Sequence, residues 1–317
     1  MAAVGKAVYE DIARGLGEDG VLPAFVEKDY YATRALQVAA AYAARPDVDF
    51  DVSFGGGTSL SKRGLIGRFS EDVDLLVSPK PDRPNLTRSH RRAFRKGLLE
   101  AIAGSGSLSV HDVDVMDASS NVRIRAAYPR QFDEELLRPH VQVDLRFQAV
   151  RLPTPPDRVT SLLADKIGEG PAFTIPMVDP AEIAGDKLSA LMWKSASDRG
   201  TGDDLTYVRH LHDLAALRPA LTDSRDSFRE IARDSMLDDI RRGRGGLTRD
   251  HGVAQRLVVG YRSLATPAYE AAYETYVDKF SYLPAAERID FRSALDEVRE
   301  LSEALAPSVS LSRGRGV

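Results

Sequence analysis

The feature that most constrains this chain is the stretch from Phe54 to Val77, FGGGTSLSKRGLIGRFSEDVDLLV. Three glycines precede a short Ser/Lys segment, and two aspartates, Asp72 and Asp74, then lie in an apolar run that reads as a strand. Glycines before a helix let the backbone approach a ligand closely, and the free N–H groups of a helix start bind phosphate. The stretch predicts either a turn, a helix and an edge strand with solvated charges, or a phosphate-binding loop leading to a metal-binding carboxylate pair.

The two aspartates favour the second interpretation. Asp72 and Asp74 are two residues apart on the expected strand, so their side chains should lie on one face. Two carboxylates on one face repel each other unless they are solvated or bridged by cations. That spacing suits Mg²⁺ ions, which hold the attacking and leaving oxygens in nucleotidyl transfer. For an isolated pair of this kind, an edge strand with a solvated polar face is the alternative.

A third carboxylate strengthens the metal interpretation. The segment HVQVDLRF, residues 140–147, alternates apolar and polar side chains and places Asp144 on the polar face of another strand. If the two strands are neighbours, Asp144 joins the first pair. The segment HDVDV also offers two carboxylates on one face, Asp112 and Asp114. Because no glycine turn precedes it, we interpret it as a solvated strand.

Hydrophobic periodicity divides the 317 residues into three parts. Residues 1–45 show helical spacing and are expected to pack as N-terminal helices on the core. Residues 46–152 hold five short alternating runs typical of half-buried strands. Helical spacing then dominates residues 153–317, and prolines near residue 153 mark the boundary. The sequence therefore predicts an α/β (α+β) protein with a strand-rich core and a helical C-terminal domain.

Composition excludes several classes of protein. The chain has no cysteine, which rules out disulfides, thiolate zinc sites and a cysteine nucleophile. It has no apolar run long enough to span a bilayer, and its first residues lack the apolar run of a signal peptide, so we expect a cytoplasmic protein. The formal net charge is −4. A nucleic-acid partner must therefore meet a local basic patch.

The clearest basic patch is the segment TRSHRRAFRK, residues 87–96. It reads as a helix within the strand-rich part of the chain. Helical spacing gathers four arginines on one side of it: Arg88, Arg91, Arg92 and Arg95. This side either forms one wall of a groove for a polyanionic acceptor such as RNA, or is only a solvated face.

The order of these features resembles that of the polymerase-β-like nucleotidyltransferases: a glycine-rich helix start, a DxD strand and a lone Asp on a later strand. FGGGTSLSK followed by GRFSEDVDL is similar to the core motif of the AbiEii/AbiGii family of nucleotidyltransferase toxins. VEKDYYATRAL, AEIAGDKLSALMWK and VRHLHDLAAL resemble that family's first helix and its later helical motifs. The similarity spans residues 26–217. It departs at His210, where the family usually carries Asp beside the Arg, and this puts the role of that position in doubt.

The resemblance implies a polymerase-β-like core with a mixed sheet, and an active site in the cleft between it and the helical domain. It implies two Mg²⁺ ions held by Asp72, Asp74 and Asp144, with Asp144 on the metal that activates the acceptor hydroxyl. It implies an NTP substrate and a catalytic Lys187 against the phosphates. The nucleotide-binding roles that it implies extend over Gly56, Gly57, Thr58, Lys62, Ser70, Lys187, Arg209 and Asp213.

Several of these residues also have plainer interpretations. Lys62 is equally well read as an exposed lysine, and a solvated side chain is the default for Lys187. Arg209 and Asp213 are four residues apart on one helical face, so they form either a simple ion pair or a pair that orients Lys187 or the base.

The resemblance further implies a toxin of a toxin–antitoxin or phage-defence pair. Its acceptor would be RNA, with the 3′ end of tRNA expected first, and its partner a cognate antitoxin. Two other classes stay open. One is a nucleotidyltransferase that modifies a protein or a small molecule such as an antibiotic. The other is a non-catalytic nucleotide-binding or partner-binding module.

Overall fold

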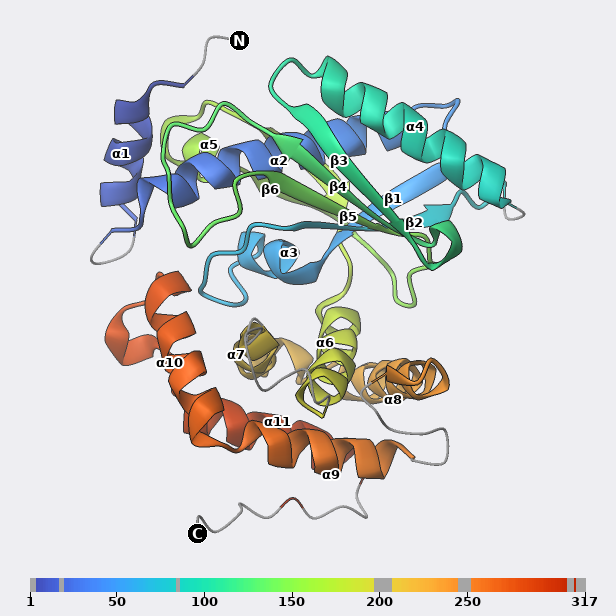
Figure 1. The fold of residues 1–317 in the computed structure, drawn as a ribbon, viewed down its shortest axis with the longest axis vertical. Coiled ribbons are helices and arrows are strands. Elements are labelled where there is room, and N and C mark those ends of the chain that lie inside the picture. Colours follow the sequence, from blue (N-terminus) through green and yellow to red (C-terminus); the bar gives the residue numbers. More distant parts are fainter. Residues whose placement is uncertain are drawn as a thin grey trace. The chain divides into compact units, whose positions relative to one another are not determined.

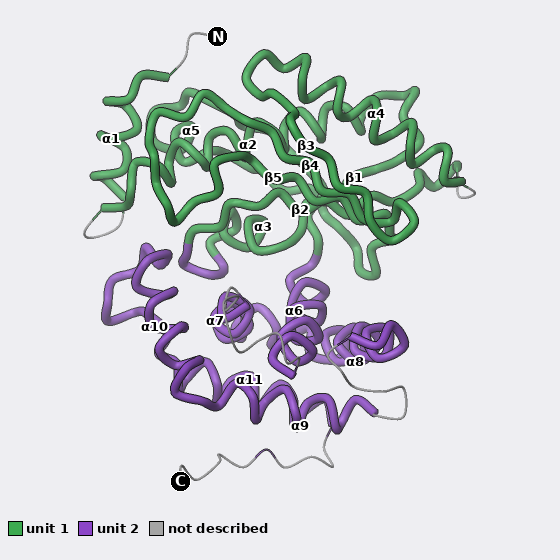
Figure 2. The backbone as a smooth tube through the Cα atoms, viewed as in Figure 1, with its two compact units in different colours: residues 1–64, 69–178 green, residues 65–68, 179–317 purple. Residues whose placement is uncertain are grey.

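The computed structural model of the protein describes residues 4–16, 20–83, 86–196, 207–244, 252–306 and 311. The chain forms two compact units (Figure 2). Unit 1 comprises residues 1–64 and 69–178, and unit 2 comprises residues 65–68 and 179–317. The short segment 65–68 is thus part of unit 2, although both of its flanks belong to unit 1.

Unit 1 is built on a mixed five-stranded sheet, as predicted (Figure 1). The strand order is β1-β2-β5-β4-β3, in which β2 and β5 are parallel and the other neighbours antiparallel. The five predicted alternating runs coincide with the five strands, which are β1 (Phe50–Gly55), β2 (Val73–Pro79), β3 (Ser109–Met116), β4 (Asn121–Ala127) and β5 (Val141–Arg146).

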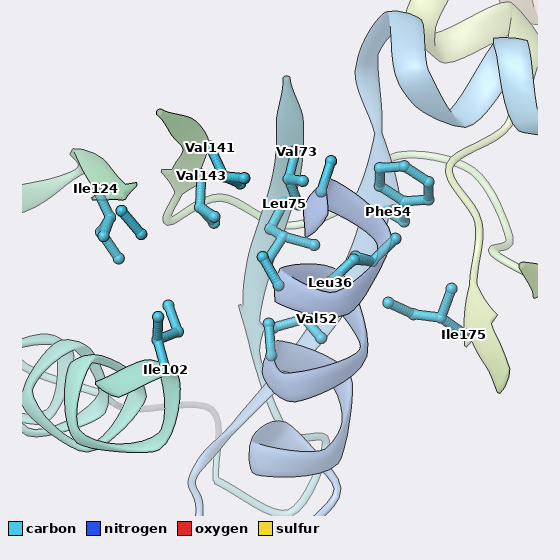
Figure 3. Close-up of a cluster of buried hydrophobic side chains, with 14 of the residues drawn as sticks. Leu36, Val52, Phe54, Val73, Leu75, Ile102, Ile124, Val141, Val143 and Ile175 are labelled. Atoms are coloured by element: carbon cyan, nitrogen blue, oxygen red, sulfur yellow. The ribbon is translucent and has the colours of Figure 1, made fainter. Parts of the chain in front are cut away.

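Helices cover the apolar face of this sheet. The helices of unit 1 are α1 (Lys6–Arg14), α2 (Pro23–Ala43), α3 (Gly56–Lys62), α4 (Arg88–Gly104) and α5 (Leu162–Ile167), and a 3₁₀ turn follows β3 (Asp117–Ser119). Alternate strand residues face α2 and α4 in one buried cluster (Figure 3), whose labelled members include Leu36, Val52, Val73, Leu75, Ile102, Ile124 and Val143. The opposite, polar face of the sheet carries the residues between them.

A second, two-stranded sheet extends unit 1 beyond the predicted boundary near residue 153. It consists of β6 (Pro156–Thr160) and β7 (Ala172–Pro176), which pair antiparallel. Phe54 at the end of β1 forms a bridge with Met177, and the Val178 N–H donates to the Phe54 carbonyl at 2.9 Å. These backbone contacts explain why the compact unit ends at Val178.

Unit 2 is helical, as the periodicity predicted. Its helices are α6 (Pro180–Ser195), α7 (Val208–Ala216), α8 (Arg225–Arg241), α9 (Val253–Leu264), α10 (Pro267–Phe280) and α11 (Phe291–Leu305), with short 3₁₀ helices at Pro219–Leu221 and Ala285–Glu287. The segment 65–68 is bound within this unit, because Arg68 bridges to Ser281 and the Tyr282 N–H donates to the Gly67 carbonyl. Within the described ranges, no helix is long and apolar enough to cross a bilayer.

Candidate active site

The sheet register brings two of the predicted carboxylates side by side. Asp74 on β2 and Asp144 on β5 are Cα partners in the parallel ladder. Directly paired residues project from the same face of a sheet, and here this is the polar face. Asp72 lies one residue before β2 and is buried. The backbone therefore gathers all three carboxylates at one end of two neighbouring strands.

Two arginines that the sequence did not single out hold the outer carboxylates. Arg138, from the segment before β5, donates through Nη1 to Asp72. Arg123 on β4 donates from Nε to Asp144 at 2.9 Å, and the Gln142 amide donates to the same carboxylate at 2.8 Å. The hydrogen bond to Asp144 raises the pKa of Arg123, against the opposing effect of burial. The arginines offset the repulsion expected among clustered carboxylates.

The glycine turn lies against this cluster. Gly56 opens α3 with φ +70°, a conformation that favours glycine. A Cβ added there would lie 1.9 Å from Asp74 Oδ2. Gly57 follows in the same short helix, and the buried Thr58 donates from Oγ1 to Ser70 Oγ at 3.0 Å. The structure thus brings the glycine turn, Thr58 and Ser70 together, while their binding of a triphosphate stays a prediction.

Gly56→Ala is expected to destabilise the protein more than Gly64→Ala. Both glycines have a left-handed φ, of +70° and +68°, but a Cβ at Gly64 would meet nothing within 4 Å. Gly64→Ala should therefore cost only the backbone strain, about 1–2 kcal/mol. Gly56→Ala should add the displacement of Asp74, about 1–3 kcal/mol more. Urea unfolding of both variants tests this, and equal losses would contradict the close approach of Gly56 to Asp74.

The carboxylates fit a divalent cation by their chemistry. Hard cations such as Mg²⁺ prefer carboxylate oxygens, and Asp74 and Asp144 supply them from adjacent strands. Within the part of the chain that the structure describes, no three His, Cys, Asp or Glu side chains are already gathered as a metal-binding group. Asp72 and Asp144 are held by arginines instead. Asp72 would act as a third ligand beside its bond from Arg138, because a carboxylate has two oxygens and about four lone-pair sites.

Lys62 is not the exposed lysine of the plainer interpretation. Its side chain is 10% exposed, and its ammonium pairs with Asp29 of α2 and donates to the Thr160 carbonyl at 2.7 Å. Two of its three donors therefore act inside unit 1. Lys62 holds α3 against α2 and the β6–β7 hairpin, and its contact with phosphate stays a prediction.

Unit 2 contains a buried charge cluster around Asp213. Asp213 on α7 is 0% exposed. Arg68 donates to both carboxylate oxygens of Asp213 in a bidentate ion pair, with both N–O distances 2.7 Å. Lys187 on α6 adds its ammonium at 2.7 Å. Burial alone would raise the pKa of Asp213, but Arg68 and Lys187 hold it well below its usual range. The default interpretation of Lys187 as a solvated lysine is wrong, because the side chain is buried in this cluster.

The neighbours of this cluster include Arg209 and His210. Asp213 pairs with Arg68 and Lys187, and the predicted pairing of Arg209 with Asp213 stays a prediction. Burial, with Lys187 and Arg209 nearby, lowers the pKa of His210 well below its ordinary value. His210 is therefore neutral near pH 7, and it supplies no negative charge where the resembling family carries a carboxylate.

The basic segment forms the first turns of α4, capped by Thr87. Helix α4 packs through Phe94, Leu98 and Ile102 on the apolar face of the sheet, opposite to the face from which Asp74 and Asp144 project. Figure 3 shows Ile102 in this position. The part of α4 in a groove for a polyanionic acceptor stays a prediction.

The four arginines of α4 differ in their surroundings. Arg88 and Arg92 are exposed and Arg95 is half-buried. Arg91 donates to Ser120 Oγ at 3.1 Å and lies over the Phe147 ring, which gives it a packing role. RNA binding by this surface stays a prediction.

The competing acidic segment on β3 is a half-exposed strand face. Asp112 and Asp114 each have 47% of the side chain exposed, and both pair with Arg125 of β4. This cross-strand bridge neutralises part of their repulsion.

A family model matches most of this chain. The sequence profile described as "Nucleotidyl transferase AbiEii toxin, Type IV TA system" matches residues 37–304. The solved structure of MenT4, a nucleotidyltransferase toxin from Mycobacterium tuberculosis H37Rv, is similar with a TM-score of 0.52 and 21% identity, covering 97% of this chain and 100% of that one. JHP933 from Helicobacter pylori is similar at a TM-score of 0.42 and 15% identity, over 89% and 94% of the two chains. No curated protein matches by sequence.

Proposed function

The chain belongs to the AbiEii family of nucleotidyl transferase toxins of type IV toxin–antitoxin systems, and from this premise we propose that it transfers NMP from an NTP to an RNA acceptor with release of pyrophosphate. The expected acceptor is the 3′ end of tRNA, and the expected partner is a cognate antitoxin in a toxin–antitoxin or phage-defence pair. The observation that carries the proposal is the pairing of Asp74 with Asp144 on one sheet face, with Gly56 against Asp74.

The reaction is a displacement at the α-phosphorus of the NTP. The acceptor hydroxyl oxygen bonds to that phosphorus while its bond to the bridging oxygen breaks, and pyrophosphate leaves. The proton of the hydroxyl passes to the Asp144 carboxylate, which keeps lone pairs beyond its bonds from Arg123 and Gln142. Mg²⁺ held by Asp74 and Asp144, with Asp72 as a third ligand, would stabilise charge on the attacking and leaving oxygens.

The cations near Asp213 support a phosphate-binding role for Lys187. Arg68 and Lys187 both pair with Asp213, so two cations lie close together in this buried group. An anionic ligand such as a phosphate is attracted to closely spaced cations. The proposal for Lys187 rests on this proximity of two buried cations.

The acceptor is identified by incubation of the protein with each α-labelled NTP, Mg²⁺, and total RNA or total protein. We expect label in a ribonuclease-sensitive, protease-resistant product, with tRNA as the labelled band. Label in protein or in a small molecule would replace the RNA acceptor by that class. An absence of label in every fraction would favour a non-catalytic nucleotide-binding module.

A further inference from the structure

We propose that Lys28 is a positioning residue that sets the places of the carboxylates on β2 and β5. The inference rests on the proposed function, since it concerns the same cation-binding cluster. Lys28 lies on α2 in the segment VEKDYYATRAL, and the proposed reaction assigns it no role. The inference is based on the three acceptors that its ammonium contacts.

Lys28 is wholly buried, at 0% exposure. Its Nζ donates to the Arg138 carbonyl at 2.7 Å and to the His140 carbonyl, and it pairs with Glu71 Oε2 at 3.2 Å. An ammonium has three donors, so these three acceptors satisfy it. A buried charge is tolerated only when it is paired and hydrogen-bonded in this way.

These acceptors belong to the two segments that lead into the carboxylate strands. Glu71 directly precedes Asp72, and His140 directly precedes the first residue of β5. The two segments also contact each other, because the Arg138 N–H donates to Glu71 Oε2 at 3.2 Å. Strands β2 and β5 are parallel neighbours, so the segments that precede them reach the same edge of the sheet, where Lys28 links them. Its removal should loosen the relative placement of Asp72, Asp74 and Asp144.

Lys28 also fixes the position of Arg138, the arginine that donates to Asp72. Arg138 gives its carbonyl to Lys28 and its guanidinium to Asp72. The lysine therefore acts on Asp72 twice, through the adjacent Glu71 and through Arg138. Groups that orient metal ligands in this way commonly change metal affinity by about 10–100-fold when they are replaced.

The neighbouring Glu27 provides a matched control. It is also 0% exposed and on α2, but its carboxylate accepts the N–H groups of Gln131 at 2.8 Å and Phe132 at 3.4 Å. That loop is not adjacent in sequence to any of the three aspartates. A buried charge that matters only for folding should therefore behave alike at Glu27 and Lys28, whereas a positioning role should separate them.

The test is Mn²⁺ binding to the full-length protein, measured through the relaxation of water protons. The stability of each variant is measured in parallel by urea unfolding. Lys28→Met is expected to weaken Mn²⁺ affinity by about 10–100-fold. Glu27→Gln should lower stability but leave Mn²⁺ affinity near that of the wild type. The direction of the change in Mn²⁺ affinity is informative, because loss of a positive charge near the aspartates would by itself strengthen cation binding. If Lys28→Met does not fold, Lys28→Arg takes its place in the same Mn²⁺ measurement, because it keeps the charge and changes the contact geometry.

The outcomes separate this inference from the proposed function. Wild-type protein that binds Mn²⁺, together with a folded Lys28 variant that binds it equally or more tightly, overturns the positioning role alone. Equal losses of affinity in the Lys28 and Glu27 variants also overturn it. Wild-type protein that does not bind Mn²⁺ contradicts the carboxylate cation site itself, and the inference falls with it.

Discussion

Asp74→Asn is expected to lower nucleotide transfer by about 1,000-fold while the protein stays folded. Asp74 lies at the centre of the cluster, in register with Asp144 and against Gly56. Loss of its charge removes a ligand for a cation whose stabilisation of the transition state is worth several kcal/mol, and each 1.36 kcal/mol is tenfold in rate. The fold should tolerate the change, because the substitution keeps the shape of the side chain and relieves repulsion. Single-turnover transfer of labelled nucleotide and a thermal melt measure the two effects.

Asp114→Asn is the matched control for this experiment. Asp114 projects from the same polar face, in register with Arg123, but it lies on the edge strand and pairs with Arg125. It should transfer nucleotide at nearly the wild-type rate. Near-normal transfer by Asp74→Asn, or an equal loss in both variants, would remove the central role assigned to Asp74.

Asp213→Asn should cost about 3–5 kcal/mol of stability, because it leaves two buried cations without their carboxylate. Arg68 and Lys187 are themselves almost wholly buried, so water cannot compensate them. The pKa of Asp213 is held below its usual value, so its contribution is complete above about pH 4 and is lost only as pH falls through the folded-state value. Urea unfolding of the full chain at pH 7 therefore reports the whole effect.

Two further variants sharpen this measurement. Asp238→Asn makes the same chemical change at a half-exposed ion pair with Arg242 and should cost no more than about 1 kcal/mol. Lys187→Met combined with Asp213→Asn should be less destabilised than Asp213→Asn alone, because it removes one of the stranded cations. A loss at Asp213 as small as that at Asp238 would contradict the buried charge cluster.

The secondary structure was largely predictable because its signals are local. The alternation in HVQVDLRF and EDVDLLV identified β5 and β2, and the same alternation identified the other three strands. Helical spacing identified α2, α6 and α7 and the helical character of unit 2. The β6–β7 hairpin was missed because prolines near residue 153 resemble a domain boundary, whereas its backbone contacts with β1 are visible only in the structure.

The candidate site was predictable in its carboxylates but not in its cations. Alternation placed Asp74 and Asp144 on polar faces, yet their adjacency depended on a parallel pairing that no local pattern specifies. Arg138 lies in an irregular segment and meets Asp72 across 66 positions of the chain, so periodicity could not find it. Arg123 had a usable signal, since the alternation of NVRIRAAY puts it on the polar face of β4.

Charge runs and isolated lysines were the least informative signals. The basic segment correctly indicated a helix, but the sequence did not show which face of the sheet α4 covers. For Lys62, exposure and phosphate contact had equal weight in the sequence, and a solvated side chain was the default for Lys187. The structure places both lysines against aspartates of other helices. Such pairs depend on tertiary packing and leave no local pattern in the sequence.

The most direct test of the central claim is the stoichiometry of pyrophosphate release. Purified protein, Mg²⁺, one α-labelled NTP and tRNA are incubated together, and the pyrophosphate formed is compared with the nucleotide joined to RNA. The account predicts one pyrophosphate for each nucleotide joined, with neither product when RNA is omitted or when Asp74→Asn replaces the wild type. Release of inorganic phosphate instead of pyrophosphate, or consumption of NTP without labelled RNA, would contradict nucleotidyl transfer to RNA.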